Sequence, residues 1–149
     1  ISECLVGSEM CIRDRFSIPV SNLVANGMEV NMETPGSVDH DGSLLDYCRL
    51  HDITLQAWSP FQMPSWKGCF LGSDEYPELN QKIRVLAEKY GVSDTTIAAA
   101  WILRHPAKMQ LVTGTASENR LKEIIAACNI TLTREEWYEL YLAAGHPLP

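Results

Sequence analysis

The sequence predicts an α/β fold that forms the latter part of a larger barrel or sheet. Short apolar segments typical of strands alternate with helical segments, and this order favours parallel strands joined by right-handed crossovers. The 149 residues, of which 46% are hydrophobic, are enough for one domain with a core. The few strands that the pattern predicts cannot by themselves make a stable parallel sheet covered on both faces. We therefore expect an incomplete barrel or sheet.

The first 15 residues show neither helical nor strand periodicity. The chain begins at Ile1, and the segment SEMCIRDR leads into no predicted element, so we expect residues 1–15 to be a non-native or disordered leader. A mobile native terminus is the alternative. Residues 16–149 then form the domain. Within it, residues 16–43 are rich in turn-forming residues and are expected to be a long loop, of the kind that serves as a lid or a binding loop.

A helix and a strand are expected after this loop. Ser43 is a suitable N-cap for a helix over SLLDYCRLHD. In ITLQAWSPF, the apolar Ile53, Leu55 and Ala57 alternate with polar residues before Pro60 ends the run, which indicates a short strand. Residues 62–76 are a second loop.

The rest of the chain predicts helices around one further strand, MQLVTG. The segment PELNQKIRVLAEKYGV has an apolar stripe, and DTTIAAAWILRH is a second, more apolar helix. A helix over residues 117–129 and a final helix over REEWYELYLAAG follow the strand. The expected helix-end signals are Gly91 as a C-cap, Ser93 or Asp94 as an N-cap, Ser117 at the next helix start, and a capping box formed by Thr133 and Glu136.

Composition excludes several classes of function. The formal charge of −7 opposes general attraction to nucleic acid or to an anionic membrane. No apolar run is long enough to span a bilayer. The five cysteines are scattered and form no C-x-x-C pair, which fits neither a disulfide framework nor a metal site. A cytoplasmic protein is expected, and the sequence indicates no oligomeric state.

The end of the last strand is the strongest candidate site. Thr113, Gly114 and Thr115 lie at a helix start, where free N–H groups and the helix dipole attract a phosphate. Arg120 can add a guanidinium fork, and Glu123 can accept from an exocyclic amine. The alternative is that Thr115 or Ser117 only caps the helix and that Arg120 and Glu123 are a surface pair.

The earlier strand ends in Trp58 and Ser59, at the position where a barrel strand opens into its site. The indole of Trp58 can stack on a heteroaromatic ring, or it is a core or rim aromatic. In the loop that follows, Trp66 and Phe70 are candidates for an exposed pocket wall, although ordinary packing explains them equally well.

Residues 16–149 resemble the C-terminal portion of the aldo/keto reductases, in particular the bacterial oxidoreductases. The resemblance rests on SLLDYCRLHDITLQAWSPF, IAAAWILRHPAKMQLVTGTASENRLKEI and LTREEWYEL, in that order. It implies the C-terminal part of a (β/α)8 TIM barrel, from the end of its sixth strand to the C-terminal helix. It also implies a parent protein that uses NADPH to reduce aldehydes or ketones.

The resemblance assigns cofactor-binding roles. Trp58 is similar to the aromatic residue that stacks on nicotinamide, and Ser59 and Phe61 to the loop along the pyrophosphate. The remaining residues that it assigns are Gly114 and Thr115 at the adenosine phosphate, Arg120 on adenine and the 2'-phosphate, and Glu123 near the adenine amine.

This chain departs from the family pattern at two positions of the adenine side. Ile124 stands where many members have Asn, and Gly114 where other branches have Lys. These differences weaken the adenine contact and the preference for NADP.

The family's catalytic Tyr, Lys, Asp and His come from earlier strands that have no counterpart in this sequence. We therefore expect no catalytic residue and no reductase activity in this chain alone, and a small carbonyl substrate for the parent. The alternatives are a non-catalytic NADP-binding regulatory subunit of the same fold and an interaction domain that binds no nucleotide.

Overall fold

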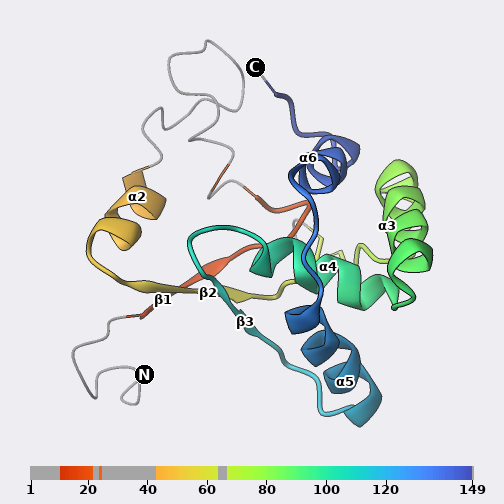
Figure 1. Cartoon of the computed structure of the whole chain (residues 1–149), viewed down its shortest axis with the longest axis horizontal. Coiled ribbons are helices and arrows are strands. Elements are labelled where there is room, and N and C mark those ends of the chain that lie inside the picture. The colour runs from red at the N-terminus through yellow and green to blue at the C-terminus, as the bar shows by residue number, and fades with distance from the viewer. Residues whose placement is uncertain (1–10, 22–23, 25–42, 64–66, 149) are drawn as a thin grey trace.

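The computed structural model describes residues 11–21, 24, 43–63 and 67–148. Its centre is a parallel sheet of β1 (Cys11–Arg15), β2 (Thr54–Trp58) and β3 (Gln110–Val112), in the order β1-β2-β3 (Figure 1). All three strands run in the same direction, so their carboxyl ends lie at one edge. The predicted parallel α/β arrangement is thus present in the described residues.

The structure differs from the sequence-based expectation at β1. Cys11–Arg15 lies in the expected leader, yet it pairs with β2 in a register that runs from Cys11 opposite Thr54 to Arg15 opposite Trp58. A strand needs only backbone hydrogen bonds to a neighbour, so it forms without apolar alternation when it joins the edge of a sheet. Residues 1–10, and most of the long loop predicted over residues 16–43, lie outside the described residues.

The two predicted strands are confirmed as β2 and β3. Leu55 and Ala57 are buried, as the alternation predicts, while Gln56 lies on the opposite face and donates from its amide to Gln110 Oε1 at 3.1 Å. In the strand register Trp58 lies opposite Val112, so β2 and β3 end side by side at the same edge of the sheet.

The predicted helices are also confirmed, with boundaries shifted by a few residues. The first three are α2 (Ser43–Leu50), α3 (Pro77–Tyr90) and α4 (Asp94–Leu103); α5 (Glu118–Ala126), the short 3-10 helix η3 (Ala127–Asn129) and α6 (Arg134–Ala143) follow β3. Gly91 ends α3 in the left-handed region at φ 66°, and Ser93 caps α4 by accepting from the Thr96 N–H. The Thr133 and Glu136 capping box is present in both directions.

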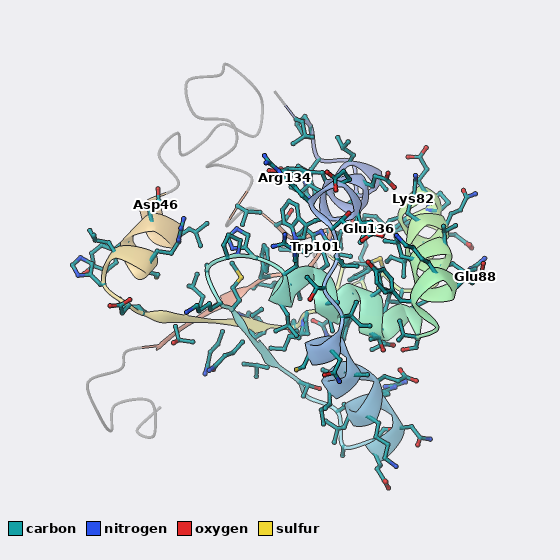
Figure 2. All side chains as sticks on the ribbon, viewed as in Figure 1. Asp46, Lys82, Glu88, Trp101, Arg134 and Glu136 are labelled. Carbon is teal, nitrogen blue, oxygen red and sulfur yellow. The ribbon has the colours of Figure 1, made fainter. Side chains whose placement is uncertain are left out.

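Helix α4 lies among the other helices and against β3, whereas α2 stands apart beside the start of β2 (Figure 1). Residues 96–102 of α4 are all buried, which explains why this helix is apolar all round. Trp101, fully buried, lies where α4 meets α6 (Figure 2). The core therefore lies between α4 and its neighbours, and it leaves the carboxyl edge of the sheet open.

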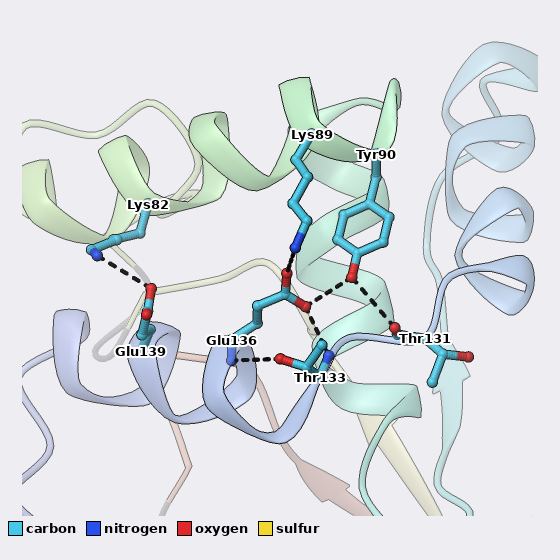
Figure 3. Close-up of polar contacts among 7 residues, drawn as sticks. All are labelled: Lys82, Lys89, Tyr90, Thr131, Thr133, Glu136 and Glu139. Carbon is cyan, nitrogen blue, oxygen red and sulfur yellow. Dashed lines mark hydrogen bonds and ion pairs between the residues drawn. The ribbon is translucent and has the colours of Figure 1, made fainter.

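A buried carboxylate joins α3 to α6. Glu136 accepts hydrogen bonds from Lys89 Nζ at 2.5 Å, from Tyr90 Oη at 2.8 Å and from the Thr133 N–H at 2.7 Å (Figure 3). Burial by itself raises the pKa of Glu136, but these hydrogen bonds outweigh it and lower the pKa below its ordinary value. The carboxylate is thus held in its charged form.

None of the helices in the described part of the chain has both the length and the apolar character that a bilayer crossing requires.

Candidate functional site

A cleft of about 860 Å³ opens at the carboxyl ends of β2 and β3. Its walls come from the segments that follow these two strands and from the first turns of α4 and α5. Because β2 and β3 are adjacent and parallel, residues more than fifty positions apart in sequence meet here. The cleft lies where the sequence predicts a site.

The cleft brings together most of the residues singled out from the sequence. Those that line it are Trp58, Ser59, Phe61, Gly114, Thr115 and Arg120. Glu123 does not line it; the Glu123 carbonyl accepts from Thr96 Oγ1 of α4 at 2.8 Å. Ile124, four residues after Arg120, lines the cleft instead. A helix turns about 100° per residue, so Ile124 lies about 40° to one side of Arg120 and Glu123 about 60° to the other.

One wall of the cleft is formed by the segment after β2, which we call the β2 wall. A strained turn sets the direction of the chain there. Trp58 is half-buried, and Ser59 after it has a φ of 51°, in the left-handed region that a non-glycine residue seldom adopts. The Gln62 N–H donates to the Ser59 carbonyl at 3.1 Å and closes the turn. Such strain persists only where the surroundings enforce it, and it concentrates at functional sites.

The loop over residues 62–76 completes this wall, but through other residues than those that the sequence singled out. Gly68, Cys69 and Leu71 line the cleft, and Cys69 pairs with Gln62 in an antiparallel bridge. Phe70, a predicted pocket-wall aromatic, is instead fully buried in the core, and Trp66 lies outside the described residues.

Asn80 of α3 holds this loop in place from behind. Its buried side-chain amide donates to the carbonyls of Phe70, Ser73 and Tyr76 at 2.9, 3.1 and 2.9 Å, and its Oδ1 accepts from the Gly72 N–H at 2.8 Å. The sequence did contain a signal, because a polar Asn interrupts the apolar stripe of α3 next to Leu79. A buried polar residue within such a stripe indicates a structural hydrogen-bond network.

On the β3 wall, two threonines arrange the backbone before α5. The Thr113 hydroxyl accepts from the Thr115 N–H at 3.4 Å, and the Thr115 hydroxyl accepts from the Ser117 N–H at 3.2 Å. Ser117 is the N-cap of α5, but its side chain makes no capping hydrogen bond. The first N–H groups of α5 therefore keep their capacity to donate to a ligand.

The charge at this wall is positive. Glu118 and Lys122 pair with each other at 2.7 Å, and in the described part of the chain Arg120 between them makes no ion pair. Its guanidinium adds to the positive end of the α5 dipole. Arg120 is the one charged side chain in the described lining, so an anion suits this cleft.

Comparison with known proteins gives consistent results. The model of the aldo/keto reductase family matches residues 15–141. A 6-dehydroglucose reductase of Agrobacterium fabrum is 31% identical over 83% of this chain and 39% of its own length. A 6-dehydroglucose reductase of Novosphingobium aromaticivorans is 29% identical over 70% of this chain and 34% of its own length. The chain thus spans less than two fifths of the length of these curated relatives.

Solved structures with a similar fold include the thermostable aldo-keto reductase Tm1743 in complex with epalrestat, with a TM-score of 0.60 and 22% identity. MGS-M4, an aldo-keto reductase from a Medee basin deep-sea metagenome library, gives a TM-score of 0.56 and 16% identity. Each covers 90% of this chain and 39% of the solved chain. This partial likeness confirms the predicted fold class, an incomplete (β/α)8 barrel.

Proposed function

Because this chain belongs to the aldo/keto reductase family, we propose that it is the NADP(H)-binding part of a reductase that converts aldehydes or ketones to alcohols by hydride transfer. The observation that carries this proposal is the meeting in one cleft of Trp58, after β2, with Thr115 and Arg120, after β3. A flat ring on one wall and an anion-binding helix start on the other match the two ends of a nicotinamide dinucleotide.

The size and chemistry of the cleft fit such a cofactor. Its volume, about 860 Å³, is near the upper end of the range for cofactor and ligand sites. Apart from Gly114 and its two chain neighbours, no described residue has an atom within 4 Å of the position that a Cβ on Gly114 would take, so a phosphate has room to approach the backbone there. The uncapped N–H groups at the start of α5 supply donors for it.

The two walls of the cleft then bind different parts of the cofactor. Trp58 offers an indole face to the nicotinamide, and Ser59 and Phe61 follow along the pyrophosphate. On the other wall, Thr115 and the start of α5 bind the adenosine phosphate, and Arg120 binds the 2'-phosphate through its guanidinium fork. Glu123 does not line the cleft, so its contact with the adenine amine stays a prediction that this proposal does not use.

A bound nicotinamide cofactor supplies the hydride for carbonyl reduction. The residues of this chain bind and orient it, and the described lining of the cleft contains no carboxyl group, histidine or tyrosine to protonate the carbonyl oxygen. We infer that the general acid belongs to the part of the barrel that the relatives have beyond this chain's 39% share. Accordingly, this polypeptide alone is expected to bind the cofactor without reducing a carbonyl.

The direct test is to titrate the purified chain with NADPH and with NADH, following tryptophan fluorescence and the melting temperature. We expect both cofactors to quench fluorescence, NADPH at lower concentration, and Trp58→Leu to remove most of the quenching. Arg120→Gln should weaken NADPH about tenfold, since it removes a charge-assisted contact, and leave NADH nearly unchanged.

Lys122→Gln is the matched control, because Lys122 is also an exposed cation of α5 but does not line the cleft. The proposal fails if the folded chain shows neither quenching nor a thermal shift at millimolar NADPH. It also fails if the Arg120 and Lys122 variants weaken NADPH equally, since general electrostatic attraction would then explain the binding.

A further inference from the structure

A second, smaller cavity lies where the end of α4 meets the first turns of α6. Its volume is about 260 Å³, and it is lined by Arg104, His105, Pro106, Arg134, Trp137 and Tyr138. Thr95, in the cleft described above, and Arg104, in this cavity, lie about 14 Å apart along α4 at 1.5 Å per residue. The two sites are therefore at opposite ends of the same helix.

The cavity carries two positive charges without a carboxylate to neutralise them. Within the described ranges, neither Arg104 nor Arg134 forms an ion pair, and no acidic residue lines the cavity. Arg104 Nε donates to the Leu132 carbonyl at 2.7 Å, which fixes the guanidinium and leaves its terminal N–H groups to donate elsewhere. Arg134 projects from α6 on the side away from α3 (Figure 2), 5.8 Å from the centre of the Tyr138 ring.

His105 also lines the cavity and adds a neutral donor to it. Its Nδ1 accepts from the Ala107 N–H at 3.2 Å. Burial, together with the charge of Arg49, lowers the pKa of His105 to about 4, so the ring is neutral at pH 7 and carries its proton on Nε2. The imidazole can therefore donate one hydrogen bond without adding a third positive charge to the cavity.

Aromatic rings form the rest of the wall. Trp137 and Tyr138 meet edge to face, with ring centres 5.1 Å apart and an angle of 82° between their planes. The Trp137 N–H is bonded to the Trp101 carbonyl at 3.0 Å, and its ring already stacks on Trp101 and on Tyr141, so this buried indole offers a carbon edge to the cavity. Such surfaces favour a planar apolar group.

From this arrangement we propose that the cavity binds a small organic anion with a planar apolar body, of the aromatic carboxylate class. The carboxylate lies between the Arg104 and Arg134 guanidinium groups, where it is held by charge-assisted hydrogen bonds, and the ring packs against Trp137 and Tyr138. The volume of the cavity limits the ligand to about the size of one substituted ring.

The test is to titrate the full 149-residue chain, labelled with ¹⁵N, with sodium benzoate, and to follow the indole N–H signals of Trp137 and Trp58 by NMR. We expect the Trp137 signal to move with a dissociation constant on the order of 1 mM, and the Trp58 signal to stay in place. Benzamide and acetate are the comparison ligands. Benzamide lacks the carboxylate and acetate lacks the ring, so each should bind at least tenfold more weakly than benzoate.

Arg134→Gln should weaken benzoate about tenfold, and Tyr138→Leu severalfold. The matched control is Arg84→Gln, which removes an exposed arginine of α3 that is not part of the cavity. Because Arg134 is exposed and Tyr138 half-buried, both variants should fold. The proposal is overturned if benzoate leaves the Trp137 signal unchanged at 20 mM, if benzamide binds as well as benzoate, or if the Arg84 variant loses as much affinity as the Arg134 variant.

Discussion

Trp101 of α4 and Trp137 of α6 exchange a pair of hydrogen bonds. Each indole N–H donates to the backbone carbonyl of the other residue at 3.0 Å, and the rings stack with centres 4.6 Å apart and only 7° between their planes. Both indoles are buried, so every polar atom of the pair has its partner inside the protein. The contact fixes α6 to the most deeply buried helix of the domain.

Replacing Trp101 with Phe is expected to destabilise the domain by about 2–4 kcal/mol. The change leaves the Trp137 carbonyl without its buried donor and opens a cavity where the indole was. Denaturant unfolding measures the free energy. Tyr138→Phe is the control: among the described residues the Tyr138 hydroxyl has no hydrogen bond, so its loss should cost less than about 0.5 kcal/mol. Equal losses in both variants would contradict the importance of the exchanged bonds.

Glu136 and Glu139 both belong to α6 and both pair with a lysine of α3, but they should differ in their contribution to stability (Figure 3). The Glu136 side chain is 9% exposed and accepts several hydrogen bonds, whereas the Glu139 side chain is 54% exposed. Glu136→Gln is therefore expected to cost about 2 kcal/mol of unfolding free energy. Glu139→Gln should cost less than about 0.5 kcal/mol. Thermal unfolding at two salt concentrations measures both, and a larger loss for Glu139 would refute this assignment.

His105 should make the domain less stable in acid. Its pKa is about 4 in the folded state and 6.5 as the ordinary value, so the unfolded chain binds a proton more readily in this interval. The contribution of His105 is complete above pH 6.5 and is lost as the pH falls toward 4.

Because the ring is partly exposed, about 1 kcal/mol is expected to be lost between pH 7.5 and 5. His105→Asn should remove that part of the slope when unfolding is measured across this range. His51→Asn, at the exposed end of α2, is the control. An unchanged slope in the His105 variant would show that another group is responsible.

Asn80 should determine whether the loop behind the cleft is ordered. Asn80→Leu removes the donor to three carbonyls and the acceptor of the Gly72 N–H, and it is expected to cost about 2–4 kcal/mol. Cys69, an exposed thiol of this loop, provides the readout: its reaction with a thiol reagent should become faster at 25 °C. Asn119→Leu, at an exposed position of α5, should change neither quantity. If the Cys69 rate stays the same in the Asn80 variant, the loop has another support.

Local signals made much of this structure predictable. Gly91 and the pair of Thr133 and Glu136 act within one helical turn, so their spacing in sequence is enough to place helix ends. Strand β1 was not predictable in the same way, because its pairing with β2 is a long-range contact. The same limit applies to Asn80, whose partners lie in a loop without a regular pattern.

Within the candidate site, the position of Trp58 and Thr115 after parallel strands predicted that both lie at the same edge of the sheet, and both line the cleft there. The sequence did not show which of Glu123 and Ile124 lines the cleft, because adjacent helical residues face directions about 100° apart and long-range packing sets the orientation of α5. The cofactor-binding roles of the candidate residues stay predictions until binding is measured.

The burial of residues 96–102 on all sides of α4 has a consequence for synthesis of the chain on the ribosome. When α4 has just emerged, α3 has already been made, but α5, η3 and α6 have not. During that interval the apolar residues 97–102 have α3 and Phe16 as lasting neighbours but lack β3, α5 and η3, so part of their surface is open to water or to other nascent chains. The domain is therefore most vulnerable to aggregation before its last helix is complete, and translation speed over residues 104–143 sets how long that period lasts.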